Sequence, residues 1–349
     1  MLKTSPRNQI HPFLNPHKTS DCRSGEDTLN SDMPELLKER LKRQGYHILG
    51  ERGAFKACQW QRKSLVEGQS CYKERFYGIE SHRCLQMTPV VDKCTHACRF
   101  CWRVTPGDIG ISWDQVSVSS KDVLPPDELL ESTMKANIRS LGGYNPEIKR
   151  GISKDKYDEA RNPKHLAISL AGEPTLYPFL GDLIEEAGKR DMTTFLVTNG
   201  TRPLVLESIT QPTQLYITLA APDEKTYRTL CRPVQRGSWA KIQESQELLQ
   251  SLPGRKVNRL TMVAGLNMHE PRKYADMILL GEPDFVEVKG YMFLGSSRDR
   301  LDNTNAPSHR DIRAFSGKLA DLTGYSMQDE QIESRVVLLS SGKKKGKIV

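Results

Sequence analysis

Regular alternation between strand-like and helix-like segments is the feature that most constrains the fold of this 349-residue chain. Strand–helix alternation favours a parallel sheet with right-handed crossovers, and six units predict an α/β fold built as a partial (β/α)6 barrel, short of closure. The predicted strands are Leu85–Val91, His165–Leu170, Thr193–Thr198, Leu215–Leu219, Arg259–Ala264 and Phe285–Val288. The predicted helices are Pro126–Leu141, Pro178–Arg190, Asp223–Leu230, Trp239–Leu249 and Pro271–Leu280.

The remaining segments predict extensions on both sides of this barrel. Residues 1–32 are polar, contain three prolines and are expected to form a mobile tail. Residues 33–84 contain a helical pattern at Pro34–Gln44, capped by Ser31-Asp32, and a cysteine-rich segment. The barrel is expected over 85–295, interrupted by a long loop at Gly142–Lys164. An α/β extension over 296–349 has a helix near Ser308–Leu322, an apolar run at Val336–Leu339 and a basic tail.

Composition limits the compartment and the partners. The 51 Lys and Arg residues against 43 Asp and Glu give a net charge of +8, which suits an anionic partner such as RNA or a solubilising surface. The longest charge-free stretch, Ser208–Pro222, is shorter than the roughly 20 apolar residues of a membrane span. Met1–Ser20 lacks the apolar core of a secretion signal. We therefore expect a cytoplasmic protein without a membrane segment, and a monomer.

Three cysteines follow the first predicted strand in a C-x3-C-x2-C pattern: Cys94, Cys98 and Cys101. In a reducing compartment, clustered cysteines more often bind metal or catalyse than form disulfides. A [4Fe–4S] cluster normally takes four thiolates, so three would leave one iron open to another ligand. The alternative is zinc, for which His96 and Cys84 are the near additional ligands, although structural zinc ligands usually come as C-x2–4-C pairs.

A second set, Cys58, Cys71 and Cys84, recurs at intervals of 13 residues. This spacing fits a second cluster with an open iron. It fits equally well three small side chains buried in a core, because free cysteine packs as a small hydrophobe. Cys22 and Cys231 are not expected to be ligands.

Polar motifs follow the successive strands. Ala171-Gly172-Glu173-Pro174 comes after the second, Thr198-Asn199-Gly200 ends the third, and Thr218 closes the fourth. Asn267 and Lys289 follow the fifth and sixth. Since the carboxyl ends of parallel strands meet at one edge, these groups are expected to converge on the cysteine loop.

The cysteine pattern, the Gly172-Glu173 motif and their placement resemble the radical S-adenosylmethionine superfamily. The resemblance implies that the barrel is of that superfamily's type. It also implies a [4Fe–4S] cluster on Cys94, Cys98 and Cys101. The same resemblance implies S-adenosylmethionine contacts in the neighbourhood of Phe100, Gly172, Glu173, Thr198, Asn199 and Thr218.

The complete six-cysteine frame resembles the archaeal tRNA 4-demethylwyosine synthases, from about residue 40 to the C-terminal region. This resemblance implies two [4Fe–4S] clusters. It also implies condensation of N1-methylguanosine, at position 37 of tRNA-Phe, with pyruvate through a 5′-deoxyadenosyl radical. Lys73 matches the lysine proposed to form a Schiff base with pyruvate. Because only some fifty residues precede Cys58, we expect an external flavodoxin- or ferredoxin-like electron donor.

Candidate tRNA contacts are basic or aromatic residues near these motifs. A target base must leave its stack to reach a buried site, so aromatic side chains beside that site are candidate stacking partners. The candidates are Arg99, Arg103, the Lys149–Lys164 loop, Arg228, Arg232, Arg236 and Lys343–Lys347, with Trp102 and Tyr77 for stacking. Two other readings stay open: a radical enzyme with an accessory cluster acting on another substrate, and a zinc-containing RNA-binding protein.

Overall fold

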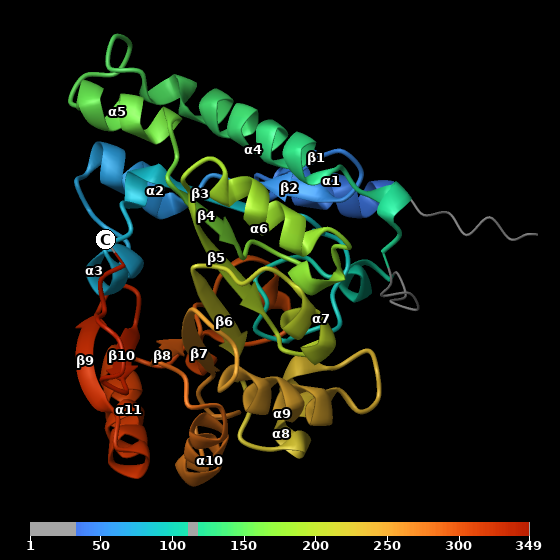
Figure 1. Ribbon diagram of the computed structural model, residues 1–349, viewed down its shortest axis with the longest axis vertical. Helices are drawn as coiled ribbons and strands as arrows, with labels where there is room; N and C mark the ends of the chain where they lie inside the picture. The colour runs from blue at the N-terminus through green and yellow to red at the C-terminus, as the bar shows by residue number, and fades with distance from the viewer. Residues whose placement is uncertain (1–32, 111–117, 349) are drawn as a thin grey trace, which may run out of the picture. The chain divides into compact units, whose positions relative to one another are not determined.

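The computed structural model describes residues 33–110 and 118–348 (Figure 1). The expected tail at 1–32, including Cys22 and the Ser31-Asp32 cap, lies outside the described residues. No described helix combines the length and the apolar character that crossing a membrane would require.

Six parallel strands form the centre of the sheet and confirm the predicted partial barrel. They are β3 (Cys84–Thr88), β4 (His165–Ile168), β5 (Thr193–Thr198), β6 (Gln214–Thr218), β7 (Arg255–Met262) and β8 (Phe285–Gly290). Each pairs in parallel with the next along the chain. The prediction placed the start of β7 at Arg259, too late, because Arg255 and Lys256 hide its beginning in a polar run.

Antiparallel hairpins extend the sheet on both edges, so it does not close. On one edge, β1 (His47–Leu49) pairs with β2 (Gly53–Phe55), which pairs with β3. On the other edge, β10 (Val336–Ser340) pairs with β8, and β9 (Ser326–Gln331) is outermost. The three-residue β1 and β2 are too short for a pattern, and the polar β9 carries no apolar alternation, so these strands were not predicted.

Helices cover one face of the parallel strands. Contacts between α4 and α6, between α9 and α10, and between α10 and α11 form this outer layer. The helices are α1 (Glu35–Arg43), α2 (Gln59–Val66), α3 (Tyr72–Tyr77), α4 (Pro126–Leu141), α5 (Lys154–Arg161), α6 (Leu180–Gly188), α7 (Pro203–Ser208), α8 (Glu224–Cys231), α9 (Ser238–Leu249), α10 (Pro271–Gly281) and α11 (His309–Thr323).

Two of these helices correct the sequence prediction. The segment Gly142–Lys164, expected to be one long loop, contains α5, whose start is capped by the Ser153 hydroxyl accepting from the Lys156 N–H. Almost every residue of α5 is charged or polar, which hides its helical period. Helix α1 begins after Pro34 rather than after the expected cap at Ser31-Asp32.

The opposite, inner face of the sheet packs on α3. Along each strand the side chains alternate, so that Leu196 packs toward the helical layer whereas Phe195 points inward. Tyr216 and Phe285 also point inward, where they meet the aromatic residues Tyr72, Phe76 and Tyr77 of α3. Helix α3 therefore packs on the inner face of the sheet and places its own Lys73 there.

Candidate active site

The first cysteine trio, Cys94, Cys98 and Cys101, lies in the loop after β3. This loop pairs with the end of α8 and the residues that follow it. The Ala97 N–H donates to the Cys231 carbonyl at 3.1 Å, and the Arg99 N–H donates to the Leu230 carbonyl at 2.9 Å. The loop is thus fixed along its length by backbone hydrogen bonds.

Residues of the C-terminal extension hold the far end of the same loop. The Arg300 guanidinium donates to the Cys101 carbonyl and, at 3.2 Å, to the Arg103 carbonyl. The Ser296 N–H donates to the Trp102 carbonyl at 2.9 Å. Gly295 has φ +56°, and a Cβ there would lie 2.2 Å from the Trp102 carbonyl oxygen, so only glycine allows this approach.

The Gly172-Glu173 motif meets the cysteine loop from the next strand. A Cβ on Gly172 (φ +74°) would lie 1.8 Å from the Val90 carbonyl oxygen. The Glu173 carboxylate is buried and accepts from the Thr198 hydroxyl at 2.6 Å and from the Asn199 N–H at 2.9 Å. Burial raises the pKa of Glu173, and the hydrogen bond from Thr198 lowers it in part. The motif therefore joins three consecutive loops of the rim.

Asn199 extends this network to the first trio. Its side-chain N–H donates to the Thr95 hydroxyl at 2.7 Å and lies 3.9 Å from the Cys94 sulfur. Gly172, Glu173, Thr198 and Asn199 thus converge beside Cys94, as their order after the strands predicted. Half-buried Thr218 ends β6.

Two other residues that were expected at this rim, Phe100 and Asn267, contact neighbouring parts of the protein. Phe100 packs between two hydrophobic clusters, one of them around Leu230 and Val263. Asn267 accepts from the Val263 N–H at 2.6 Å and donates to the Ala220 carbonyl at 2.8 Å. Asn267 therefore stabilises the loop after β7.

The buried Arg103 guanidinium offsets the negative charge of the first-trio thiolates. Burial raises the pKa of Cys94 to about 11, and the Arg103 charge lowers it. Arg103 is 2 % exposed and donates to the Val91 carbonyl at 2.7 Å. The expectation that Arg103 contacts tRNA is therefore wrong. On the same side, the buried Tyr46 hydroxyl finds no hydrogen-bond partner among residues 33–110 and 118–348, and the Cys101 charge helps raise its pKa.

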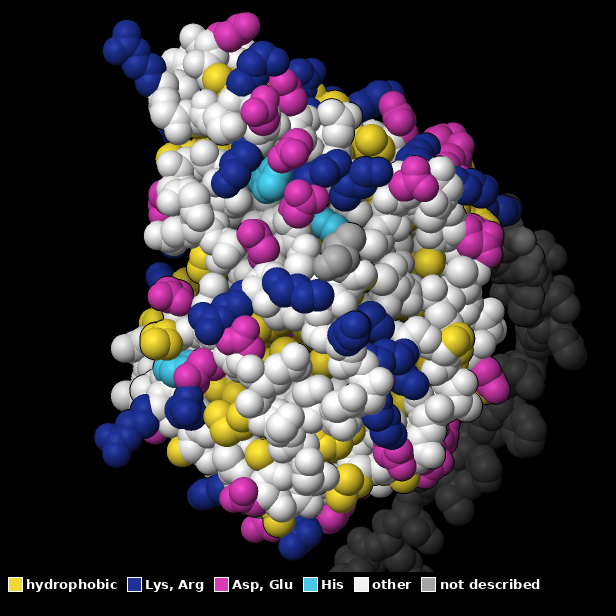
Figure 2. Space-filling model, turned by 60° about the vertical axis from the view of Figure 1, so that its left-hand side comes forward, with side chains coloured by type: hydrophobic (Ala, Val, Ile, Leu, Met, Phe, Trp, Pro, Cys, Tyr) yellow, Lys and Arg dark blue, Asp and Glu magenta, His cyan; other side chains and the backbone are white. Residues whose placement is uncertain are grey.

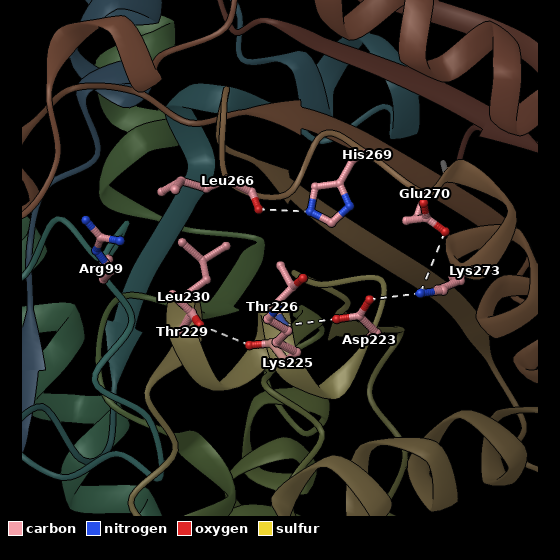
Figure 3. A pocket seen from close by; sticks show the side chains of 10 residues that line it. All are labelled: Arg99, Asp223, Lys225, Thr226, Thr229, Leu230, Leu266, His269, Glu270 and Lys273. Carbon is pink, nitrogen blue, oxygen red and sulfur yellow. Dashed lines mark hydrogen bonds and ion pairs between the residues drawn. The ribbon is translucent and has the colours of Figure 1, made fainter.

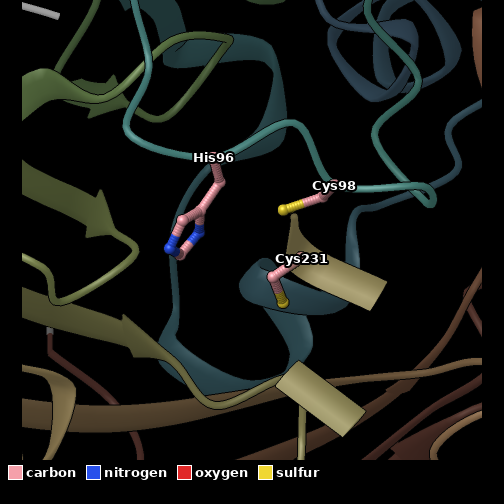
Figure 4. A group of neighbouring side chains, drawn as sticks. All are labelled: His96, Cys98 and Cys231. Atoms are coloured by element: carbon pink, nitrogen blue, oxygen red, sulfur yellow. The ribbon is translucent and has the colours of Figure 1, made fainter. Parts of the chain in front are cut away.

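Cys231, which was not expected from the sequence to be a ligand, lies beside Cys98 (Figure 4). The ligand atoms of His96, Cys98 and Cys231 all lie within 4.8 Å of one another. A hydrogen bond with the Cys231 thiol, together with burial, raises the pKa of Cys98 well above its usual value. Burial lowers the pKa of His96 to about 3, and its ring bonds to the Tyr227 hydroxyl at 2.5 Å. His96 is therefore neutral.

The second trio gathers from the ends of three elements. Cys58 directly precedes α2, Cys71 directly precedes α3, and Cys84 begins β3. Burial and then the Cys58 charge raise the pKa values of Cys71 and Cys84 to about 12 each, so the Cys58 thiol is within electrostatic range of both. Both alternatives, a second cluster and three cysteines buried in a core, therefore stay open at this point.

Lys73 faces the second trio from the inner side of the sheet. Its Nζ lies 4.7 Å from the centre of the Tyr216 ring and 5.3 Å from that of Phe195. Burial, then the Arg259 charge, lowers the pKa of Lys73. The nearby Glu287 carboxylate partly opposes this shift, so Lys73 lies among both positive and negative groups.

Glu287 is the centre of a buried polar network beside Lys73. Its carboxylate accepts from the Tyr77 hydroxyl at 2.9 Å and pairs with Arg259 at 2.9 Å. Burial would raise the pKa of Glu287, but the charges of Arg259 and Lys73 hold it below its usual value. The Tyr77 side chain is fully buried, so the expectation that it stacks on a nucleobase is wrong.

Known proteins resemble this chain over most of its length. The Radical SAM superfamily model matches residues 88–278, and the model described as Wyosine base formation matches residues 280–341. An S-adenosyl-L-methionine-dependent tRNA 4-demethylwyosine synthase of Pyrococcus abyssi is 48% identical over 89% of this chain and 90% of its own length. The enzyme of the same name from Methanocaldococcus jannaschii is 38% identical over 90% and 98%.

This chain belongs to the tRNA 4-demethylwyosine synthase family. It is therefore an enzyme, and the resemblance read from its cysteines is confirmed. A solved structure described as TYW1 with a lysine-pyruvate adduct bound has a TM-score of 0.80 and 35% identity, covering 90% of this chain and 98% of that one. A crystal structure of archaeal TYW1 has a TM-score of 0.74 and 33% identity, covering 90% and 100%.

Membership of this family implies S-adenosylmethionine and a [4Fe–4S] cluster, and cysteine thiolates are the ligands that such a cluster takes. Zinc–sulfur bonds of about 2.3 Å place tetrahedral ligands about 3.8 Å apart. In the part of the chain that is described, two ligand groups fall within 4.8 Å: His96–Cys98–Cys231 and Glu80–His82–Glu159. Neither trio is among them, so at least two sulfurs in each trio lie more than 4.8 Å apart, farther than one tetrahedral zinc ion places its ligands.

Two cavities differ in charge. One, of about 550 Å³, is lined by Cys58, Gln86, Trp102 and residues of α2, and so joins the inner face to the cysteine loop. The other, of about 380 Å³, lies against α8 and α10 (Figure 3). Its Lys273 Nζ pairs with Asp223 at 3.0 Å and with Glu270 at 3.7 Å. The charged side chains that line the larger cavity are the basic Lys56 and Arg62, whereas the lining of the smaller cavity mixes basic side chains with the acidic Asp223 and Glu270.

The other basic residues proposed for tRNA lie apart from the larger cavity. Arg228 pairs with Glu224, whereas Arg232 and Arg236 are exposed. Lys343 pairs with Glu282 and Lys344 with Asp284, at the amino end of β8 and therefore opposite the cysteine loop. On the face in Figure 2, basic and acidic side chains are interspersed.

Proposed function

We propose that this enzyme condenses N1-methylguanosine at position 37 of tRNA-Phe with pyruvate to form 4-demethylwyosine, with cleavage of a carbon–carbon bond of pyruvate and loss of one of its carbons. The family supports the product and the tRNA substrate. The position of Lys73 beside the second cysteine trio is the observation that carries the use of pyruvate. A related solved structure, described as holding a lysine-pyruvate adduct, supports the same assignment.

Six cysteines hold the cofactors in this proposal. Cys94, Cys98 and Cys101 would hold the first [4Fe–4S] cluster, and Cys58, Cys71 and Cys84 would hold a second one. The first cluster and S-adenosylmethionine, when bound, would supply the 5′-deoxyadenosyl radical chemistry that activates the N1-methyl group. Gly172, Glu173, Thr198 and Asn199 fix the rim around Cys94, with Phe100 and Thr218 bordering the same space.

Lys73 binds pyruvate covalently. A neutral amine is required for attack on the keto carbon, and burial next to Arg259 favours that neutral form. The Lys73 Nζ forms a bond to C2 of pyruvate, and the keto oxygen leaves as water, giving a C=N bond. Arg259 and Lys289 lie on the same inner face and offer positive charge to the pyruvate carboxylate.

Borohydride reduction in the presence of pyruvate tests this role. We expect the mass of one reduced pyruvate adduct on the peptide that contains Lys73, located by mass spectrometry. Lys289 is the internal competitor, because burial lowers its pKa to about 8. A label on Lys289, or no label on either amine, would contradict the assignment of Lys73.

The proposal also includes the electron donor, the cellular compartment and the oligomeric state. Each cleavage of S-adenosylmethionine consumes one electron, and we expect a separate flavodoxin- or ferredoxin-like protein to supply it. The enzyme is proposed to work in the cytoplasm as a monomer. Turnover with a purified flavodoxin and its reductase, compared with turnover driven by dithionite, tests the first point.

A further inference from the structure

Three aromatic rings line the larger cavity, and the ammonium group of a lysine lies over each of them. The Lys56 Nζ lies 5.1 Å from the centre of the Trp102 ring. The Lys63 Nζ lies 5.1 Å from that of Trp60, and the Lys149 Nζ lies 5.0 Å from that of Tyr144. We call Trp60, Trp102 and Tyr144 the aromatic wall.

The aromatic wall is accessible and has a positive environment. Trp102 is 39% exposed, and Trp60 and Tyr144 are partly exposed. All three rings line the cavity of about 550 Å³, whose charged lining residues are the basic Lys56 and Arg62. Because the residues come from α2, from the cysteine loop and from the segment after α4, the wall surrounds the cavity rather than forming one flat patch.

Aromatic rings beside lysines suit one chemical class of partner. Every nucleobase has a π-face that stacks on an aromatic side chain, whatever its sequence, and lysine neutralises the adjoining phosphates. When a base is drawn out of a loop, its neighbours lose their own stacking partner. Rings at the wall of the receiving cavity can replace that partner.

We infer that the aromatic wall stacks on the unpaired RNA nucleotides that flank the target base, with Lys63 and Lys149 placed near their phosphates. The inference rests on the proposed function for the identity of the RNA and adds the surface that binds it. The smaller cavity offers no comparable surface, because no Phe, Tyr or Trp is among the described residues that line it.

Equilibrium binding of tRNA-Phe carrying N1-methylguanosine to the full chain, measured by fluorescence anisotropy, tests the inference. Stacking of one base on an aromatic ring is worth about 1–3 kcal/mol, so Trp60→Leu and Tyr144→Leu should each raise Kd roughly 5- to 150-fold. Trp60→Phe and Tyr144→Phe keep a π-face and should retain most of the affinity. Unchanged Kd values for both leucine variants would overturn the inference.

Tyr157 is the matched control for Tyr144. Both side chains pack on the hydrophobic cluster around Leu65 and Leu141, and Tyr157 also carries a cation, the Arg161 guanidinium at 5.8 Å. Tyr157 does not line the cavity. Tyr157→Leu should therefore leave Kd unchanged, and an equal loss in this variant would show that the measured effect comes from packing rather than from stacking.

RNA variants separate stacking from indirect effects. One RNA lacks the base before the target and another lacks the base after it. If a ring stacks on the missing base, replacing that ring by Trp60→Leu or Tyr144→Leu should no longer raise the Kd for that RNA. An undiminished penalty on both abasic RNAs would overturn the inference. Lys63→Gln and Lys149→Gln should each reduce the slope of log K against log salt by about 0.7 if each lysine neutralises one phosphate.

Two further outcomes are distinguishable. If the leucine variants bind tRNA normally but slow only the reaction driven by a protein electron donor, the wall docks that donor and the inference is wrong. If the wild-type chain makes no 4-demethylwyosine from tRNA and pyruvate, the proposed function fails instead.

Discussion

The two cysteine trios begin from opposite ends of the same strand and are built differently. Cys84 starts β3, whereas Cys94, Cys98 and Cys101 follow its end within one short loop. The first trio is beside Arg103, which keeps its charge, and the second is beside Lys73, whose pKa is lowered. A permanent cation can only stabilise thiolates, whereas an amine that loses its proton can also form a covalent bond.

Substitution of the first trio should have the largest effect. Cys94→Ala, Cys98→Ala and Cys101→Ala should each abolish cleavage of S-adenosylmethionine, measured as 5′-deoxyadenosine under dithionite. Cys231→Ala is the control, because Cys231 lies beside Cys98 without belonging to the trio. Cleavage that survives in the trio variants would contradict the assignment, and its loss in Cys231→Ala would make Cys231 a ligand.

Lys73→Ala should separate the two halves of the reaction. We expect no 4-demethylwyosine, because the covalent attachment of pyruvate is lost, while 5′-deoxyadenosine still forms. Chromatography of the digested tRNA measures 4-demethylwyosine, and chromatography of the reaction mixture measures 5′-deoxyadenosine. Product formed by Lys73→Ala would move the role to another amine, of which Lys289 is the nearest candidate by its environment.

Removal of the second trio should halve the iron. After anaerobic reconstitution, the wild type should contain about eight irons per chain and the Cys58/Cys71/Cys84→Ala variant about four, as expected for two cubane clusters. Iron and acid-labile sulfide analysis gives these values. About four irons in both proteins would mean that the second trio only packs.

Gly172→Ala should damage the first site selectively. A residue forced into positive φ costs roughly 1–3 kcal/mol, and here the added Cβ also meets the Val90 carbonyl oxygen. We expect a lower thermal unfolding midpoint and loss of iron from the first trio, while the second keeps its iron. Gly188→Ala, at a helical glycine with open space around its Cβ, is the control.

Arg103→Met should give the smallest effect, a pH shift. Cysteines bind metal as thiolates, and the Arg103 charge lowers the pKa of Cys94, so its removal raises that pKa. The midpoint of iron incorporation should therefore move to higher pH, by about 1–3 units for the loss of one close opposite charge. An unshifted midpoint would show that the Arg103 charge does not control the deprotonation of Cys94.

The sequence predicted the local features of this site and left the distant ones open. The first trio is contained in eight residues, and its neighbours follow strands whose order predicts their convergence. The second trio depends on where α2 and α3 begin, which short polar helices do not reveal. Spacing therefore could not decide between a cluster and three core residues.

Side-chain exposure was the least predictable property. Trp102 and Tyr77 looked equally suited to stacking, but Tyr77 lies under the sheet, hydrogen-bonded to Glu287, whereas Trp102 borders a cavity. Arg103 and Arg99 likewise flank the same cysteine, and only Arg103 is fully buried. Trp60 and Tyr144 were missed because a lone aromatic residue near a lysine carries no pattern until the fold places several around one space.

The hydrogen bond from Arg300 to the Cys101 carbonyl affects when the cysteine loop can reach its final structure during protein synthesis. The two residues are 199 positions apart, and translation at about 5–20 residues per second separates their synthesis by roughly 10–40 seconds. During that interval the newly made cysteine loop lacks its last support. During synthesis there is therefore a stage at which the three cysteines are present but their loop does not yet have its final geometry. A cluster delivered after the chain is complete would bind to a fully formed site.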